Sequence, residues 1–356
     1  MSRFFSSKHS LLRAYTPGEQ PQDMQYIKLN TNESPFPVPE SVKKAAADAS
    51  ARINLYPDPE CSILKYKIAE MCGVGADNVI LANGSDEILN FIFAAYGDDK
   101  HPFIFPDITY GFYKVFAQLN GVMYNEMPLR DDFTIGIGDY CNKNKNIIIA
   151  NPNAPTGICI TLDDITAIAK SNPDNIVTID EAYVDFGGDS AIKLINELPN
   201  LIVTQTFSKS RSMAGARLGF AVAQRELIND LSTIRYSTNP YNINSFTMNA
   251  AIAAVAENDY FMENCRKIAE TRESVKNRLE KMGFILTDSK ANFLFAKHDA
   301  VSGEELYSEL KRRGVLVRHF ESERISQYNR ITIGSSEQMK KFCDITEKIL
   351  TERGAV

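Results

Sequence analysis

The sequence contains no tryptophan, and only four histidines and six cysteines among its 356 residues. The cysteines form no Cys-x-x-Cys pair and the histidines show no metal-ligand spacing. We therefore expect reduced thiols in a cytoplasmic protein and no metal centre. No run of about 18 apolar residues occurs, and the N-terminus lacks the long apolar core of a signal peptide, so neither a membrane span nor secretion is expected. The net charge of −6 without a basic stripe also disfavours nucleic-acid binding.

A regular alternation of apolar runs and amphipathic segments begins near residue 60. The runs at 147–150 and 176–179 are continuously apolar, which is typical of strands buried on both faces. The pattern predicts an α/β fold with a mostly parallel central sheet sandwiched between helices. The expected strands are 78–82, 102–105, 121–127, 146–150, 176–180, 201–206 and 217–223, and the expected helices are 39–51, 61–72, 85–96, 109–119 and 161–171.

The pattern changes after about residue 240. Residues 244–282 are predicted to be helical with one break near Asn258, and shorter elements follow. We expect three parts: residues 1–40 as an N-terminal arm that contributes to the small domain and to a dimer, residues 41–255 as a large domain, and residues 256–356 as a small α+β domain. The elements expected in the last part are strands 284–287, 291–296, 315–318 and 330–334 and helices 302–313 and 336–352.

One lysine, Lys209, lies between two predicted core strands. It follows the apolar strand 201–206 within Thr206-Phe-Ser208-Lys209, and Arg217 comes eight positions later, just before the next buried strand. A lysine in this position is not an ordinary solvated side chain. An amine held near an aldehyde, with hydroxyl groups and a guanidinium beside it to hold a phosphate, suggests a site for pyridoxal phosphate (PLP).

Other polar residues follow the ends of predicted strands, where ligands gather in an open α/β sheet. Gly84-Ser85-Asp86 leads from a strand into a helix, whose N-terminus favours a phosphate. Asp180 ends its strand and can pair with a protonated pyridine nitrogen, and Tyr183 lies three residues further on. Each feature alone also fits a plain structural role, namely a capped helix or a surface turn.

Two further segments follow strands in the same way. Tyr110 opens a helix and could stack on a flat ring, although a core aromatic is an equally good interpretation. The turn Asn151-Pro-Asn153-Ala154-Pro155-Thr-Gly157 is rigid because it holds two prolines, and it could be simply a turn. The order of these features along the chain, each at a strand end, favours a common site.

From about Tyr15 to Gly334 the chain resembles the fold-type I aminotransferases. The motifs that carry the resemblance are Lys28-Leu-Asn-Thr-Asn-Glu-Ser-Pro, Tyr56-Pro, Gly84-Ser-Asp-Glu, Thr109-Tyr-Gly-Phe-Tyr, the Pro-Thr-Gly turn, Asp180-Glu-Ala-Tyr, Thr206-Phe-Ser-Lys and Arg330-Ile-Thr-Ile-Gly. The resemblance implies bound PLP, with Lys209 joined covalently to its aldehyde and Asp180 paired with its ring nitrogen. It also implies that Tyr183 binds the ring O3′ and that Tyr110 covers the ring. The remaining implied contacts are Ser85, Asp86, Thr206, Ser208, Arg217 and, from the neighbouring subunit of a homodimer, Tyr56 at the phosphate region, with Tyr15, Arg318 and Arg330 at the anionic ends of the substrates.

The sequence departs from the family at one position. The family usually has an asparagine directly before Pro-Thr-Gly that binds O3′, and this chain has Ala154 there. Either Asn153 shifts to take that role or Tyr183 holds O3′ alone. Related turns also imply a cis bond between Ala154 and Pro155.

Within the family, the N-terminal arm and the overall pattern resemble enzymes that act on histidinol phosphate. This implies ping-pong transamination between histidinol phosphate and 2-oxoglutarate, both small molecules. An aromatic-amino-acid aminotransferase and a threonine-phosphate decarboxylase of the same fold remain alternatives. A non-catalytic PLP-binding domain is a further alternative. A nucleotide-binding dehydrogenase is suggested only by Gly73-Val-Gly75, which lacks a third glycine.

Overall fold

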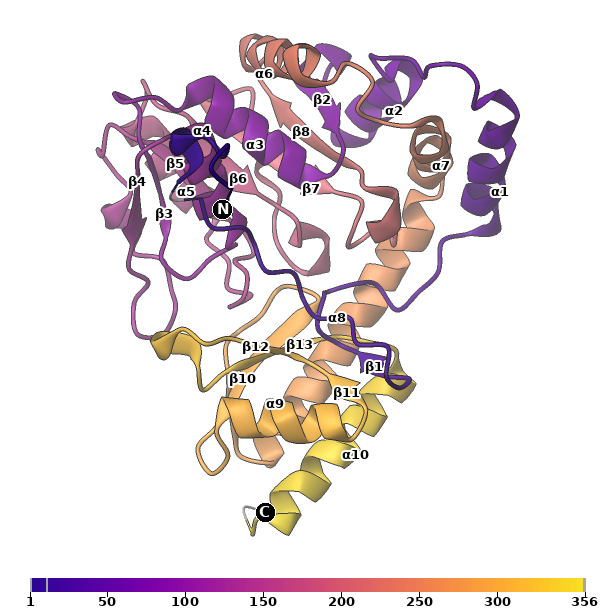
Figure 1. Cartoon of the computed structure of the whole chain (residues 1–356), viewed down its shortest axis with the longest axis vertical. Helices are drawn as coiled ribbons and strands as arrows, with labels where there is room; N and C mark the ends of the chain where they lie inside the picture. The colour runs from indigo at the N-terminus through magenta and orange to yellow at the C-terminus, as the bar shows by residue number, and fades with distance from the viewer. Residues whose placement is uncertain (1, 11, 355–356) are drawn as a thin grey trace.

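A seven-stranded sheet forms the centre of the computed structural model, which describes residues 2–10 and 12–354. The strand order is β2-β8-β7-β6-β5-β3-β4 (Figure 1), and β8 alone runs antiparallel to its neighbours. The strands are β2 (Val79–Ala82), β3 (Phe103–Pro106), β4 (Tyr124–Met127), β5 (Asn146–Ala150), β6 (Val177–Asp180), β7 (Leu201–Thr206) and β8 (Gly219–Ala223). The prediction of a mostly parallel α/β sheet is confirmed.

Helices cover both faces of this sheet, and the alternation of side chains along each strand explains why. In β5, Ile147 and Ile149 pack into the core beneath α2, α5 and α7, whereas Ile148 packs into the core beneath α3, α4 and α6. Both faces of the strand are therefore buried, as its continuous apolar sequence requires. The helices of this part are α1 (Glu40–Asp48), α2 (Ser62–Cys72), α3 (Ser85–Tyr96), α4 (Phe112–Asn120), α5 (Leu162–Ser171), α6 (Arg225–Thr238) and α7 (Ser245–Ala256).

A second, antiparallel sheet lies towards the C-terminus, with strand order β12-β13-β10-β9. The long helix α8 runs from the region of α7 to this sheet (Figure 1). A separate short pairing joins β1 of the N-terminal arm to β11. The elements are β1 (Ile27–Lys28), α8 (Asn258–Lys281), β9 (Phe284–Leu286), β10 (Phe293–His298), α9 (Gly303–Arg312), β11 (Val315–Leu316), β12 (Arg318–His319), β13 (Asn329–Thr332) and α10 (Ser336–Glu352). Among the helices described, none combines the length and apolar character needed to cross a membrane.

Most predicted elements are present, and the differences have local causes. The helix predicted at 109–119 begins only at Phe112. Gly121 ends this helix with φ 70°, and for that reason the strand predicted from residue 121 begins only at Tyr124. The predicted break near Asn258 separates α7 from α8. Neither β1 nor α6 has a counterpart among the predicted elements.

Candidate functional site

Lys209 lies in a compact loop between β7 and β8. The backbone N–H of Met213 donates to the carbonyl of Phe207 across 3.0 Å and closes this loop. The amine of Lys209 donates to the carbonyl oxygen of Thr31 at 3.1 Å. Burial, together with the positive charge of Arg330, lowers the pKa of Lys209 to about 8. A larger share of neutral amine at neutral pH makes this lysine a better nucleophile and base.

Asp180 ends β6 on the floor of the same site and is only 4% exposed. The hydroxyl of Tyr113 donates to Oδ2 at 2.8 Å, and the hydroxyl of Thr204 donates to Oδ1 at 3.3 Å. Burial nevertheless raises the pKa of Asp180 to about 6. A cationic group bound against this carboxylate would be stabilised by it, as a protonated pyridine nitrogen requires.

An anion site is formed where β2 turns into α3. Gly84 has φ 88° and precedes the first turn of α3, whose N-terminus carries no side-chain cap among the described residues. The guanidinium of Arg217 lies beside this turn, donating to Asp86 Oδ2 at 3.1 Å and to Ser208 Oγ at 3.3 Å. Backbone N–H groups, a hydroxyl and an arginine therefore converge, which suits a phosphate. Arg217 itself has φ 56°, a strained value typical of functional positions.

Two tyrosines complete the walls. The hydroxyl of Tyr110 donates to Asp86 Oδ1 at 2.7 Å. The hydroxyl of Tyr183 accepts from the amide of Asn32 at 3.0 Å, and its ring packs edge-on against Phe293. The Lys209 amine lies 5.8 Å from the centre of the Tyr183 ring.

Together these side chains line one pocket. Its lining consists of Ser85, Asp86, Tyr110, Ala150, Ala154, Asp180, Ala182, Tyr183, Thr206, Ser208, Lys209 and Arg217. The structure thus brings together residues from the ends of five strands, namely β2, β3, β5, β6 and β7.

The predicted substrate residues line a neighbouring space that shares Lys209, Tyr110 and Tyr183 with the pocket. Arg330 donates to the carbonyl of Asn30 at 2.9 Å, and its Nε has no partner among the described residues. Arg318 opens onto the same space and contacts the carbonyl of Thr16 at 3.5 Å. Tyr15 lines this space too, where its ring stacks on Phe112 at 4.2 Å.

Asn153 is one of the two residues predicted to bind O3′, and its side chain does not line the pocket in this structure. Its amide donates to the carbonyl of Ile108 and to the hydroxyl of Thr156, and its oxygen accepts from Thr109. These bonds tie the side chain to its own turn and to the segment after β3, and Ala154 lines the pocket instead. The Ala154–Pro155 bond is cis, as predicted.

Tyr56 is not among the residues that line the pocket of its own chain. It is 81% exposed and stacks on Tyr241 with ring centres 4.5 Å apart. Most of the side chain therefore remains accessible to another molecule, although one face of the ring is covered by Tyr241.

Three contacts of the site were not assigned from the sequence. Asn32 binds the Tyr183 hydroxyl, Tyr113 binds Asp180, and the carbonyl of Thr31 binds Lys209. All three residues lie within motifs that carry the family resemblance, so the motifs gave a usable signal. What the sequence lacked was the direction of each side chain.

The pocket offers what PLP needs. The amine can bond the aldehyde, the buried carboxylate faces a place for the ring nitrogen, and Tyr183 offers a hydroxyl for O3′. The α3 N-terminus with Arg217 and Ser208 suits the phosphate. The residues present therefore fit this cofactor.

Comparisons with known proteins agree with this fit. The family described as aminotransferase class I and II matches residues 24–345. A protein of Brachyspira hyodysenteriae named histidinol-phosphate aminotransferase is 48% identical, covering 98% of this chain and 99% of its own length. A protein of Clostridium acetobutylicum with the same name is 45% identical, covering 97% of this chain and 98% of its own length. The crystal structure of histidinol-phosphate aminotransferase from Sinorhizobium meliloti, in complex with pyridoxal-5'-phosphate, has a TM-score of 0.81 at 25% identity, covering 92% of this chain and 91% of that one.

Proposed function

Because the chain belongs to the class I and II aminotransferases, we propose that it transfers an amino group between histidinol phosphate and 2-oxoglutarate with bound PLP. The products are imidazole-acetol phosphate and glutamate, a step of histidine biosynthesis. The observation that carries this proposal is the 48% identity over nearly the whole chain to a histidinol-phosphate aminotransferase. The two arginines beside Lys209 support it, since both substrates are anions.

Different side chains of the pocket are proposed to bind different parts of the cofactor. Bound PLP supplies an aldehyde that takes up the amino group and a ring that withdraws electrons from the substrate Cα. Asp180 would keep the ring nitrogen protonated, Tyr183 would bind O3′, and Tyr110 would cover the ring. The phosphate region would be held by Ser85, Asp86, Thr206, Ser208 and Arg217.

Lys209 has two tasks in the reaction. With PLP bound, the Lys209 amine would hold the aldehyde until an amino donor takes its place. It would then be placed to accept the proton from the substrate Cα and to return it at the cofactor C4′. A pKa of about 8 suits both tasks, because the amine can gain and lose a proton near neutral pH.

Arg330, Arg318 and Tyr15 receive the anionic ends of the substrates. The site must accept a phosphate from one substrate and a carboxylate from the other. A planar guanidinium donates paired hydrogen bonds to either group. Arg330 is half-buried and its Nε has no partner among the described residues, so a bound anion would meet an unused donor there.

A homodimer is part of the proposal. An apolar cluster, named here the α2 patch, consists of Ile53, Leu55, Tyr56, Ile63 and Tyr66, each at least half exposed. Exposed apolar clusters of this kind mark protein contacts. In the dimer, Tyr56 reaches the phosphate region of the partner subunit. A cytoplasmic location stays a prediction.

A substrate panel tests the proposed reaction. Purified enzyme loaded with PLP is given 2-oxoglutarate and either histidinol phosphate, phenylalanine or threonine phosphate, and glutamate and CO₂ are measured. We expect glutamate chiefly from histidinol phosphate. Glutamate from phenylalanine alone would identify an aromatic aminotransferase, and CO₂ from threonine phosphate would identify a decarboxylase. Either result would refute the proposed substrate.

A further inference from the structure

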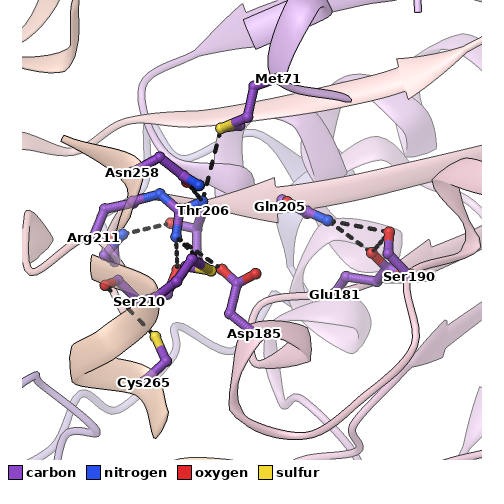
Figure 2. A network of polar contacts seen from close by, with 12 residues as sticks. Met71, Glu181, Asp185, Ser190, Gln205, Thr206, Ser210, Arg211, Asn258 and Cys265 are labelled. Atoms are coloured by element: carbon purple, nitrogen blue, oxygen red, sulfur yellow. Dashed lines mark hydrogen bonds and ion pairs between the residues drawn. The ribbon is translucent and has the colours of Figure 1, made fainter. Parts of the chain in front are cut away.

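A buried arginine, Arg211, lies two residues after Lys209 and does not line the pocket. Figure 2 shows its guanidinium among side chains from other segments. Nη1 is 3.2 Å from Asp185 Oδ2, and Nη2 is 3.0 Å from Asn258 Oδ1. The sulfurs of Met71 and Met262 lie 3.8 and 3.9 Å from these nitrogens. Among the described residues, Arg211 lines neither the cofactor pocket nor the neighbouring substrate space.

The partners of Arg211 belong to segments that matter to the site. Asp185 is in the short turn directly after Tyr183, and Asn258 is the first residue of α8. One side chain thus joins the Lys209 loop, the Tyr183 turn and the start of α8. Two different amino groups are used for the two partners, which the planar fork of arginine allows and a single ammonium does not.

Helix α8 holds the same two segments at further points. The thiol of Cys265 lies 3.9 Å from the carbonyl of Ser210 in the Lys209 loop (Figure 2). Arg272 donates to the carbonyl of Phe186 at 3.0 Å and to the carbonyl of Ala291 at 2.8 Å. The loop and the turn are therefore fastened to the helix that continues to the second sheet (Figure 1).

A second polar cluster in Figure 2 contrasts with the first. Glu181 accepts from Gln205 at 2.8 Å and from Ser190 at 2.7 Å. Glu181 and Gln205 lie at the ends of β6 and β7, which backbone hydrogen bonds already align. The Lys209 loop and the Tyr183 turn follow β7 and β6, which pair in one sheet, whereas α8 belongs to no sheet. The bond from Arg211 to Asn258 therefore sets a position that strand pairing does not determine. A buried charge strongly favours the arrangement that keeps its partners.

We propose that Arg211 is a positioning residue for transamination, fixing the Lys209 loop and the Tyr183 turn to the start of α8. Lys209 and Tyr183 approach the cofactor from different segments, and Arg211 sets the distance between those segments. A small displacement of the proton-carrying amine slows proton transfer while leaving substrate binding largely intact. This inference rests on the proposed transaminase function.

The test compares four variants of the full-length enzyme. Arg211→Met removes the charge at similar size, and Arg211→Lys keeps the charge without the fork. Asn258→Ala removes only the link to α8, at a helical position that accepts alanine well. Arg278→Met is the matched control, because Arg278 is also on α8 and pairs with Asp344 and Glu347 away from the pocket. Steady-state kinetics with saturating PLP and hydrogen exchange of the PLP-free protein are measured for each.

We expect Arg211→Met to lower kcat about 10- to 100-fold with KM within about threefold. Faster exchange is expected in residues 183–187, 207–213 and the first turn of α8. Asn258→Ala should show the same changes to a smaller degree, and Arg211→Lys should recover part of kcat. Arg278→Met should lower the melting temperature yet leave kcat within about twofold.

Several outcomes would overturn the inference. One is a normal kcat in Arg211→Met. Another is hydrogen exchange in Arg211→Met that is faster over as much of the chain as in Arg278→Met. If Arg211→Met does not fold, normal kcat and exchange in Asn258→Ala would be decisive against it. An inactive wild-type enzyme would instead refute the proposed function, and the exchange data would still test the attachment.

Discussion

The amine of Lys209 and the carboxyl group of Asp180 face the same pocket, and burial favours the uncharged form of both. It lowers the pKa of the lysine to about 8 and raises the pKa of the aspartic acid to about 6. A bound pyridinium beside Asp180 and a bond between Lys209 and an aldehyde would each remove the cost of this burial. The site is therefore less stable without its cofactor than an apolar pocket would be.

Replacing Lys209 by methionine should stabilise the PLP-free protein at pH 7. The folded pKa of about 8 lies below the unfolded value of 10.5. Below pH 8 the amine is protonated in both states, and its burial then lowers the free energy of unfolding by the full amount. The cost disappears between pH 8 and 10.5, where the unfolded chain binds more protons. We expect a gain of about 1–2 kcal/mol at pH 7, after allowing for partial solvent access. Urea unfolding at equal protein concentrations measures it, and an equal gain at pH 10 would contradict this origin.

Tyr113→Phe tests the support of Asp180. The Tyr113 hydroxyl bond lowers the pKa of Asp180, so its loss should raise that pKa and shift the acid limb of the kcat/KM profile to higher pH. We expect kcat to fall about tenfold, in keeping with a lost hydrogen bond to a charged group. Tyr140→Phe is the control, since the buried Tyr140 hydroxyl has no partner within the described residues. An unmoved acid limb in Tyr113→Phe would argue against the role of this bond.

The sequence was informative about residue types and less so about side-chain directions. Lys209, Asp180 and Arg217 could be predicted because a charged residue beside a buried strand is unusual. The direction of Asn153 could not be predicted, since two of its three partners, Ile108 and Thr109, lie more than 40 positions away in the chain. The contact of Asn32 with Tyr183 spans 151 positions of the chain, which local pattern cannot indicate.

At the level of elements, the phosphate region depends on how closely β8 approaches the start of α3. A Cβ atom on Gly219 would lie 2.3 Å from the backbone nitrogen of Ser85. No real side chain fits there, so glycine lets β8 pair with β2 while α3 begins directly beside it. The helix N-terminus that suits the phosphate is held in place by this contact.

Gly219→Ala should therefore push α3 and β8 apart. We expect a loss of stability of about 2–3 kcal/mol, as for other overpacked sites, and weaker PLP binding measured by absorbance titration. Gly215→Ala is the matched control, because no described atom lies within 4 Å of its added Cβ. Normal PLP affinity in Gly219→Ala would show that the close approach does not support the phosphate region.

Element prediction succeeded where the pattern was strong and local. The continuous apolar run of β5 gave its bounds, whereas α6 has buried residues only at Ile228, Leu231 and Arg235. Their spacing of three and four is helical, but the serines and threonines around them weaken the signal. The two residues of β1 pair with β11, where Ile27 lies opposite Val315. Because the two strands are so far apart in the sequence, no local pattern identifies β1.

At the level of the whole molecule, the two sheets are connected through α8 and the N-terminal arm. The predicted boundaries at residues 40 and 255 stay a prediction. Composition changes along the chain indicate where one kind of sheet gives way to another. They do not indicate how much one part moves against the other, because that depends on contacts between distant segments.

The proposed dimer can be tested at the α2 patch. Ile63 on α2 is 64% exposed, and a glutamate there would have to be desolvated in the interface. Ile63→Glu should convert the dimer to monomer in sedimentation velocity at micromolar concentration and weaken PLP binding, since the partner's tyrosine is lost. Ile285→Glu replaces another exposed isoleucine and should leave the dimer intact. A monomeric wild-type protein would refute the dimer.

Transamination through Lys209 is the central claim, and transfer of ¹⁵N from labelled glutamate to imidazole-acetol phosphate tests it most directly. The wild-type enzyme should yield ¹⁵N-labelled histidinol phosphate. Lys209→Arg should yield none, because a guanidinium keeps the charge but cannot bond the aldehyde or carry the proton. Labelled product formed by Lys209→Arg at a rate near that of the wild type would contradict the account.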